Sequence, residues 1–171
     1  MASKQKRKGS ALERDVAKDL SQRYNENFIR TIGSGSYVGG VNASRKDVLT
    51  ESQTRSHKGD VTPPETFHFM NMECKSYKDF NFHQLFSQNC PLLDSWIEQC
   101  LEPADEDDIN VIVIKISYQG SYVCIERHND IDNNRGLLYN NWVFFDYDVF
   151  FEDNEQVFSD VCRNGKLDES K

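Results

Sequence analysis

Two carboxylates and a lysine have a spacing that suits metal-assisted hydrolysis. Asp60 is followed, after a proline-containing turn at residues 63–66, by an extended run over residues 67–75 that ends in Glu73, Cys74 and Lys75. Side chains alternate along a strand, so Glu73 and Lys75 share a face, and a hairpin would bring Asp60 back toward them. We therefore expect two acids and one amine to converge.

Such a group repels itself unless a cation is bound. Mg²⁺ takes oxygen ligands and keeps several waters, and a nearby lysine can orient or help to deprotonate one of them. The alternative is an exposed hairpin with an ordinary Glu73–Lys75 ion pair, and the spacing alone does not decide between the two.

The same residues resemble the PD-(D/E)XK nuclease motif, with Gly59-Asp60 in place of Pro-Asp. This resemblance implies Mg²⁺, replaceable by Mn²⁺, held by Asp60, Glu73 and the backbone carbonyl of Cys74, with Lys75 as a catalytic residue.

A second resemblance lies upstream, in KGSALER at residues 8–14, which is similar to the start of archaeal Holliday junction resolvases and their phage relatives. In that family a helix glutamate joins the metal site, which makes Glu13 a further catalytic residue and metal ligand. The other interpretation is structural, because Ser10 and Glu13 also have the spacing of a helix capping box.

A strand with an arginine followed by a Gly-Ser-Gly loop continues the resemblance. Arg30 and Ser34 fit those places, and Ser36 is an equally good hydroxyl within the glycine-rich residues 33–40. The likeness to resolvases covers roughly residues 4–127.

Charge is distributed unevenly along the chain. The net charge is −8, but residues 1–60 carry +5 and residues 101–171 carry −10. We expect the basic end to contact DNA phosphates. The predicted DNA-binding residues are Lys6, Arg7, Lys8, Arg14, Arg30, Ser34, Ser36, Arg45, Lys46, Arg55 and Lys58.

Periodicity predicts an α/β chain. Apolar residues at four-residue intervals indicate a helix over residues 10–24, and residues 28–32 suit the first strand of the sheet. Two helical pieces follow Lys75, the second with Pro91 at its first position. Gln84, in the first piece, is a possible further site residue, or simply a surface glutamine. The β-branched residues 109–117 indicate a buried strand, followed by strands at 122–126 and 142–145 and a short helix at 148–151.

These elements predict a restriction-endonuclease-like core, a mixed β-sheet flanked by helices. We divide the chain into a basic N-terminal arm (1–9), a nuclease domain (10–155) with a polar insertion near 41–58, and a flexible acidic tail (156–171). Five cysteines without CxxC spacing give no zinc or disulfide pattern. No signal peptide or transmembrane run is visible, so we expect a cytoplasmic location, in the host if the protein is viral.

The function that these resemblances imply is Mg²⁺-dependent cleavage of branched DNA, with a four-way junction as the favoured substrate. Two symmetric nicks require two sites, so we expect a homodimer. Apolar residues near Trp96 and Trp142 could form its interface or be buried within one chain. The alternatives are another PD-(D/E)XK nuclease, nicking or restriction-like, and a DNA-binding protein of the same fold without catalysis.

Overall fold

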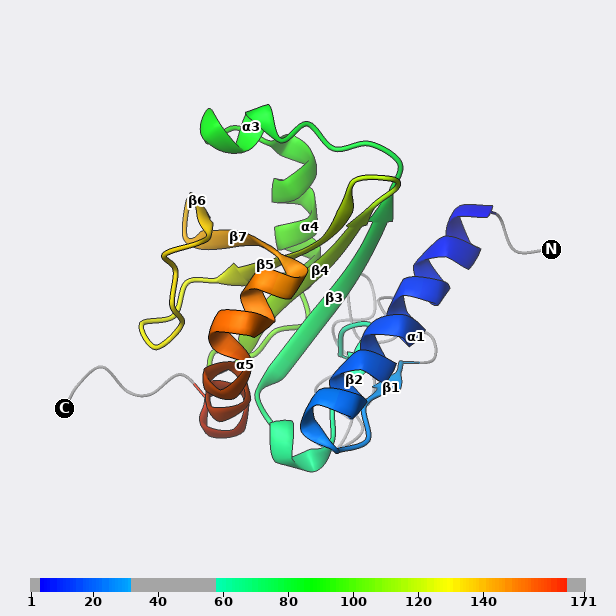
Figure 1. Cartoon of the computed structure of the whole chain (residues 1–171), viewed down its shortest axis with the longest axis vertical. Helices are drawn as coiled ribbons and strands as arrows, with labels where there is room; N and C mark the ends of the chain where they lie inside the picture. Colours follow the sequence, from blue (N-terminus) through cyan, green and yellow to red (C-terminus); the bar gives the residue numbers. More distant parts are fainter. Residues whose placement is uncertain (1–3, 32–57, 166–171) are drawn as a thin grey trace.

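A five-stranded mixed sheet forms the centre of the computed structural model, which describes residues 4–31 and 58–165 (Figure 1). The strand order is β3-β4-β5-β7-β6. The strands are β3 (Met70–Tyr77), β4 (Ile109–Ile116), β5 (Gly120–Glu126), β6 (Leu137–Tyr139) and β7 (Trp142–Asp146). Only β3 and β4 are parallel, and the other neighbours are antiparallel. The predicted restriction-endonuclease-like class, a mixed sheet flanked by helices, is confirmed.

Helices cover both faces of this sheet. On one face α1 (Lys4–Tyr24) and α5 (Tyr147–Asn164) pack against the sheet, and on the other face lies α4 (Pro91–Leu101), reached through the short α3 (His83–Phe86) (Figure 1). Pro91 begins α4, as predicted, because a first-turn position needs no backbone N–H donor. Within the described residues, no helix is long and apolar enough to cross a membrane.

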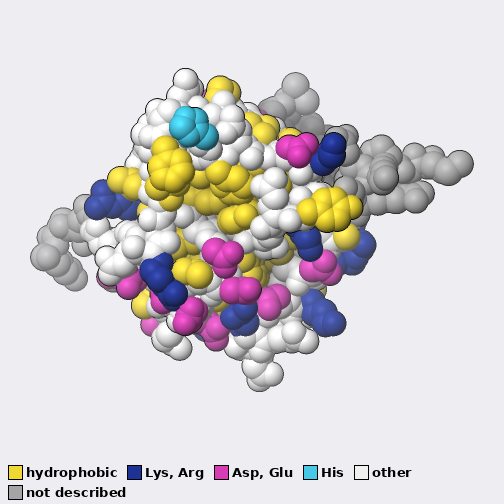
Figure 2. All heavy atoms as spheres, turned by 45° about the horizontal axis from the view of Figure 1, so that its top comes forward, with side chains coloured by type: hydrophobic (Ala, Val, Ile, Leu, Met, Phe, Trp, Pro, Cys, Tyr) yellow, Lys and Arg dark blue, Asp and Glu magenta, His cyan; other side chains and the backbone are white. Residues whose placement is uncertain are grey.

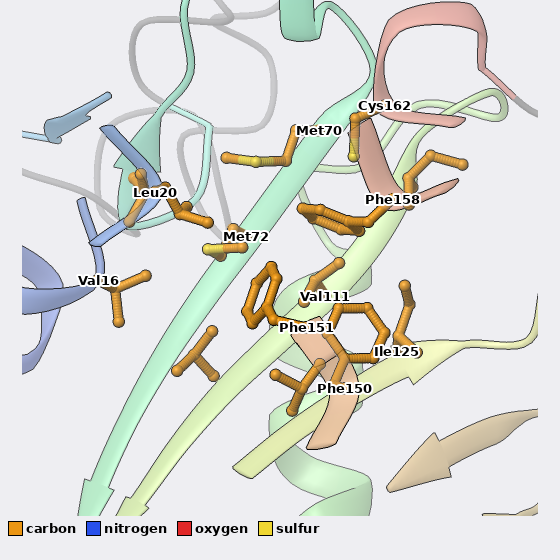
Figure 3. Close-up of a cluster of buried hydrophobic side chains, with 14 of the residues drawn as sticks. Val16, Leu20, Met70, Met72, Val111, Ile125, Phe150, Phe151, Phe158 and Cys162 are labelled. Carbon is orange, nitrogen blue, oxygen red and sulfur yellow. The ribbon is translucent and has the colours of Figure 1, made fainter. Parts of the chain in front are cut away.

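β4 carries a nearly continuous apolar sequence because both of its faces are buried. Val111 and Val113 belong to the core under α1 and α5, whereas Ile112 and Ile114 belong to the core under α4. Figure 3 shows the first of these cores, in which Val16 and Leu20 of α1 and three phenylalanines of α5 meet Met70 and Met72 of β3. The predicted buried strand at residues 109–117 is confirmed.

α1 starts earlier than predicted. It begins at Lys4, so residues 4–9 are helical, and the expectation of a separate arm over residues 1–9 is wrong for that part. Lysine, glutamine and arginine favour a helix, and a single glycine at position 9 costs only about 1 kcal/mol relative to alanine. Ser10 therefore lies inside the helix and is not its N-cap.

α5 replaces the short helix and much of the flexible tail that we expected at the C-terminal end. It runs from Tyr147 to Asn164, and Asp146 caps it by accepting from the backbone N–H groups of Asp148 (3.0 Å) and Val149 (3.3 Å). Phe158, Val161 and Cys162 are buried at helical spacing, and this apolar stripe holds residues 156–164 in the fold. Residues 166–171 lie outside the described residues.

The segment around Asp60 also differs from the predicted hairpin. β1 (Ile29–Arg30) and β2 (Val61–Thr62) pair with each other in a separate two-stranded antiparallel sheet, so the strand predicted to begin the main sheet does not join it. A 3₁₀ turn, η2 (Glu65–Phe67), follows, and β3 starts only at Met70. The buried Phe67 packs against Tyr24 and Phe28, which directs this segment into the core instead of along the strand.

The apolar residues considered for a dimer interface are mostly internal. Trp96, Trp142, Phe145, Phe150 and Phe151 are all buried within one chain. They therefore provide no support for a homodimer.

Candidate active site

Asp60 lies along the edge of β3 that does not pair with β4. Its backbone N–H donates to the carbonyl of Met72 (2.8 Å), and its Oδ2 accepts from the backbone N–H of Cys74 (2.9 Å). Both groups of β3 face this edge, and the carbonyl of Cys74 faces the same way because the N–H and C=O of one strand residue point to the same side. The edge thus presents a carboxylate and a backbone carbonyl together.

Gly59 is required by this close approach. Its φ is +66°, and a Cβ on it would lie 2.5 Å from the carbonyl oxygen of Met72. Proline, whose φ is fixed near −65°, cannot adopt this conformation. The presence of Gly-Asp where the motif usually has Pro-Asp therefore has a geometric cause in this chain.

Glu73 and Lys75 share a face of β3, as predicted, and this face is turned toward α4. Lys75 Nζ donates to Glu73 Oε1 (2.7 Å) and to Gln99 Oε1 (2.5 Å). Asn71 lies on the same face and donates to the backbone carbonyl of Cys100 in α4 (2.8 Å). The two side chains are only 13% (Lys75) and 15% (Glu73) exposed, which removes the exposed-hairpin interpretation.

Burial raises the pKa of Glu73 to about 7, and the negative charge of Asp60 adds to this effect, while Lys75 opposes it. Asp60 is also within hydrogen-bond reach of Glu73. Two carboxyl groups therefore converge beside one ammonium, and additional positive charge at this point would favour the ionised form of Glu73.

Glu13 reaches the site from α1. It is buried, and its carboxylate accepts from Nε of Arg30, whose terminal nitrogen also donates to Ser10 Oγ (3.0 Å). Because Ser10 is inside α1, the capping interpretation of Glu13 is wrong. Glu13 is close enough to Cys74 for its charge to contribute, after burial, Asp60 and Glu73, to raising the pKa of that thiol.

The donor set fits a hard divalent cation. Among the described residues, no group of three or more His, Cys, Asp or Glu side chains is arranged to hold a metal ion. Asp60, Glu73 and the carbonyl of Cys74 nevertheless offer oxygen ligands only. Mg²⁺ is commonly held by one or two carboxylates with several retained waters, which matches this set.

Lys58, which we predicted to contact DNA, is buried in ion pairs in this structure. Its side chain is 5% exposed, and Nζ donates to Asp105 Oδ2 (2.8 Å) and to Asp108 Oδ2. A lysine so deeply buried needs a paired acid, and these two aspartates precede β4. The basic residue next to the motif therefore anchors the segment that carries Asp60.

The other predicted contacts divide into three groups. Arg14 is exposed on α1, and Arg30 is partly exposed beside Glu13. Gln84 lies on α3, which packs against β6, and the amide that meets Lys75 belongs to Gln99, a residue that sequence reasoning missed. Gln99 lies in the last turn of an amphipathic helix, a position that carried no sequence signal. Ser34, Ser36, Arg45, Lys46 and Arg55 lie outside the described residues, as do the side chains of Lys6, Arg7 and Lys8.

Comparison with known proteins gave one match. A model of the family described as "Phage putative PDDEXK endonuclease" matches residues 4–162, which include every element from α1 through most of α5. No curated protein matches the chain, and no solved structure matches it.

Proposed function

The chain belongs to the phage PDDEXK endonuclease family, and from this premise we propose that it is a Mg²⁺-dependent DNA endonuclease that acts on branched DNA, most specifically on four-way junctions. The observation that carries the catalytic part is the convergence of Asp60, Glu73 and Lys75 at the edge of β3. Two buried carboxylates beside an ammonium serve no evident purpose in a protein that only binds DNA.

Each residue has a defined task in this scheme. Asp60, Glu73 and the carbonyl of Cys74 would hold the divalent cation, and Glu13 would join them on release from Arg30. The bound cation would polarise a phosphate oxygen and lower the pKa of a coordinated water. Lys75 positions the attacking water and offsets charge that develops on the phosphate. Gln99 accepts from the ammonium on the α4 side, which helps to hold Lys75 beside Glu73.

The arginines orient the substrate in this proposal. Arg30 is partly exposed beside Glu13, and Arg14 is exposed one residue further along α1. Arginine matches the geometry of a phosphate with two parallel N–H donors. A phosphate at the edge of β3 would compete with Glu13 for Arg30, which couples substrate binding to completion of the cation site.

The proposed preference for junctions rests on a sequence resemblance and on the geometry of the substrate. The first is the resemblance of residues 8–14 to the start of junction resolvases. The second is substrate geometry, because separating a junction into two intact duplexes requires two symmetric nicks, and one chain offers one Asp60–Glu73–Lys75 group. We therefore propose a symmetric homodimer as the working unit.

One cleavage experiment tests both parts. Purified protein is incubated with a four-way junction and with linear duplex of the same sequence, each with Mg²⁺, Mn²⁺ or a chelator, and Asp60→Asn serves as the control. We expect metal-dependent cleavage of the junction in preference to the duplex, lost in Asp60→Asn, and a dimer by light scattering. Equal nicking of duplex and junction by a monomer would remove the junction assignment, and absence of cleavage of any DNA would remove the nuclease assignment.

A further inference from the structure

Tyr118 lies in the turn between β4 and β5 with a backbone conformation that is unfavourable for a tyrosine. Its φ is +64°, in the left-handed region, and its relative exposure is 106%. Bulky L-residues rarely adopt positive φ, whereas glycine and asparagine do so readily. Of the four non-glycine residues with positive φ in the described part of the chain, two are asparagines, and Tyr118 is the aromatic one. Neither the turn conformation nor packing therefore explains a tyrosine here.

The base of the turn is held firmly. Ser117 donates to the carbonyl of Tyr77 through both its backbone N–H (3.0 Å) and its hydroxyl (3.3 Å). On the other side of the turn, the hydroxyl of Tyr122 donates to the carbonyl of Gln119 (3.1 Å). The backbone that carries the exposed ring is therefore held in place by these hydrogen bonds. Little backbone freedom would be lost if the ring contacted a partner.

The turn lies at the end of the sheet toward which the active-site strand points. Tyr77 is two residues beyond Lys75, about 7 Å along β3 at a rise of about 3.3 Å per residue, and Ser117, which directly precedes Tyr118 in the turn, is bonded to Tyr77. That separation corresponds to about two nucleotide steps along one strand of DNA.

This end of the molecule suits a nucleic acid. Lys78 follows β3 with a side chain that is 85% exposed and forms an ion pair with the exposed Asp79 (3.9 Å). The first turns of α1, whose sequence includes Lys4, Lys6, Arg7 and Lys8, lie at the same end of the molecule as the tip of β3 (Figure 1). Figure 2, in which this end comes forward, shows hydrophobic side chains exposed across it, with Lys and Arg as well as Asp and Glu side chains around them. Exposed aromatic rings beside cations are the usual means of binding unstacked bases.

We propose that Tyr118 is a stacking platform for a base that is unpaired or unstacked near the cleaved phosphate, such as a base at the branch point of a junction. This inference rests on the proposed function, because it places the ring beside the DNA that the Asp60–Glu73–Lys75 site cleaves. Stacking on an aromatic ring tolerates any base, so Tyr118 selects an opened DNA structure and not a sequence.

The test uses binding and fluorescence with a chelator present, so that it does not depend on cleavage. A four-way junction that carries 2-aminopurine at the branch point and a linear duplex with the same label are titrated with the full-length protein, with Tyr118→Gly and with Tyr118→Trp. Phe86→Ala is the matched control, since Phe86 is an exposed aromatic on α3, which packs against β6 at the opposite edge of the sheet.

We expect Tyr118→Gly to bind the junction about tenfold more weakly and to abolish the stacking-dependent quenching, with an unchanged or higher Tm because glycine relieves the backbone strain. Tyr118→Trp and Phe86→Ala should retain both binding and quenching. Junction binding by Tyr118→Gly within twofold of wild type, or a lower Tm with unchanged quenching, would overturn the stacking role. If the wild-type protein showed no Mg²⁺-dependent cleavage, the nuclease assignment would fail instead. The titration in chelator would still show whether Tyr118 stacks on a base.

Discussion

Arg30 donates its Nε to the carboxylate of Glu13, and this ion pair joins β1 to α1 beside Asp60 and Cys74. Glu13 was open to two interpretations in the sequence, as a helix cap and as a metal ligand. The start of α1 at Lys4 removes the first, because a residue in the third turn of a helix caps nothing. The remaining interpretation of Glu13 is as a metal ligand, and a substitution that removes only its charge tests this role.

We predict that Glu13→Gln lowers cleavage by at least about 100-fold, or roughly 3 kcal/mol in transition-state free energy at 1.36 kcal/mol per tenfold. Glutamine still accepts a hydrogen bond from Arg30, so the free energy of unfolding should change by only about 1 kcal/mol. Single-turnover cleavage and urea unfolding measure the two effects. Wild-type cleavage by Glu13→Gln would remove Glu13 from the catalytic group.

Asp60→Asn, Glu73→Gln and Lys75→Met should each abolish cleavage while the fold is retained. In Asp60→Asn the side-chain carbonyl of the asparagine can still accept from the N–H of Cys74, so the edge of β3 keeps its geometry. Metal-free DNA binding should be unchanged or tighter for the two acid variants, since a negative charge facing the phosphate is lost. Cleavage gels and binding by fluorescence anisotropy give the two readouts. Near-wild-type cleavage by any one variant would show that the chemistry lies elsewhere.

The pKa of Glu73 predicts a specific dependence on pH. Its folded value is about 7, against an ordinary value of 4.5, so the metal-free folded state holds more protons than the unfolded state between these pH values. The free energy of unfolding should therefore fall as pH rises from about 4.5 to about 7 through this group. Glu73→Gln should lose that part of the dependence. Because Mg²⁺ needs the ionised carboxylate, its apparent affinity should rise with pH up to about 7 and then level off. Urea unfolding and metal titration over pH 5–8 measure both, and an affinity that is flat over this range would contradict the assignment.

Lys58→Met should destabilise the protein without changing the salt dependence of DNA binding. The substitution leaves Asp108 buried without its cation, which costs about 3–5 kcal/mol in the free energy of unfolding. Asp105→Asn is the control, because Asp105 is 64% exposed, and we expect it to cost less than about 1 kcal/mol. Chemical denaturation and a salt titration of DNA affinity separate the two roles. A smaller salt slope in a stably folded Lys58→Met would restore Lys58 as a phosphate contact.

Deletion of residues 1–8 removes four cations and should weaken DNA binding while the chemistry of bound substrate is kept. Each lost phosphate contact should reduce the slope of log affinity against log salt by about 0.9 on duplex DNA. The measurement is a salt titration of affinity, paired with single-turnover cleavage at saturating protein. An unchanged salt slope would show that these residues do not contact phosphates.

The sequence by itself determined those features that depend on neighbours along the chain. Side-chain alternation placed Glu73 and Lys75 on one face of β3, the β-branched residues marked β4, and the apolar periodicity marked α1 and α4. The same local information located Asp60 ahead of the motif strand and identified the class of fold. These signals are local because strand alternation and helical periodicity are set by backbone geometry within a few residues.

Tertiary packing decided which groups meet. Lys58 has the sequence features of a phosphate contact, but the fold places Asp108, 50 residues later, beside it. Gln99 has no sequence signal, and it meets Lys75 only because α4 packs against β3. Arg30 meets Glu13 from β1, a strand that pairs with β2 and not with the main sheet. Whether a buried charge is stable depends on the partner that packing places beside it. These partners are distant in sequence, and burial of the whole core supplies the free energy that brings them together, so a local sequence pattern does not reveal them.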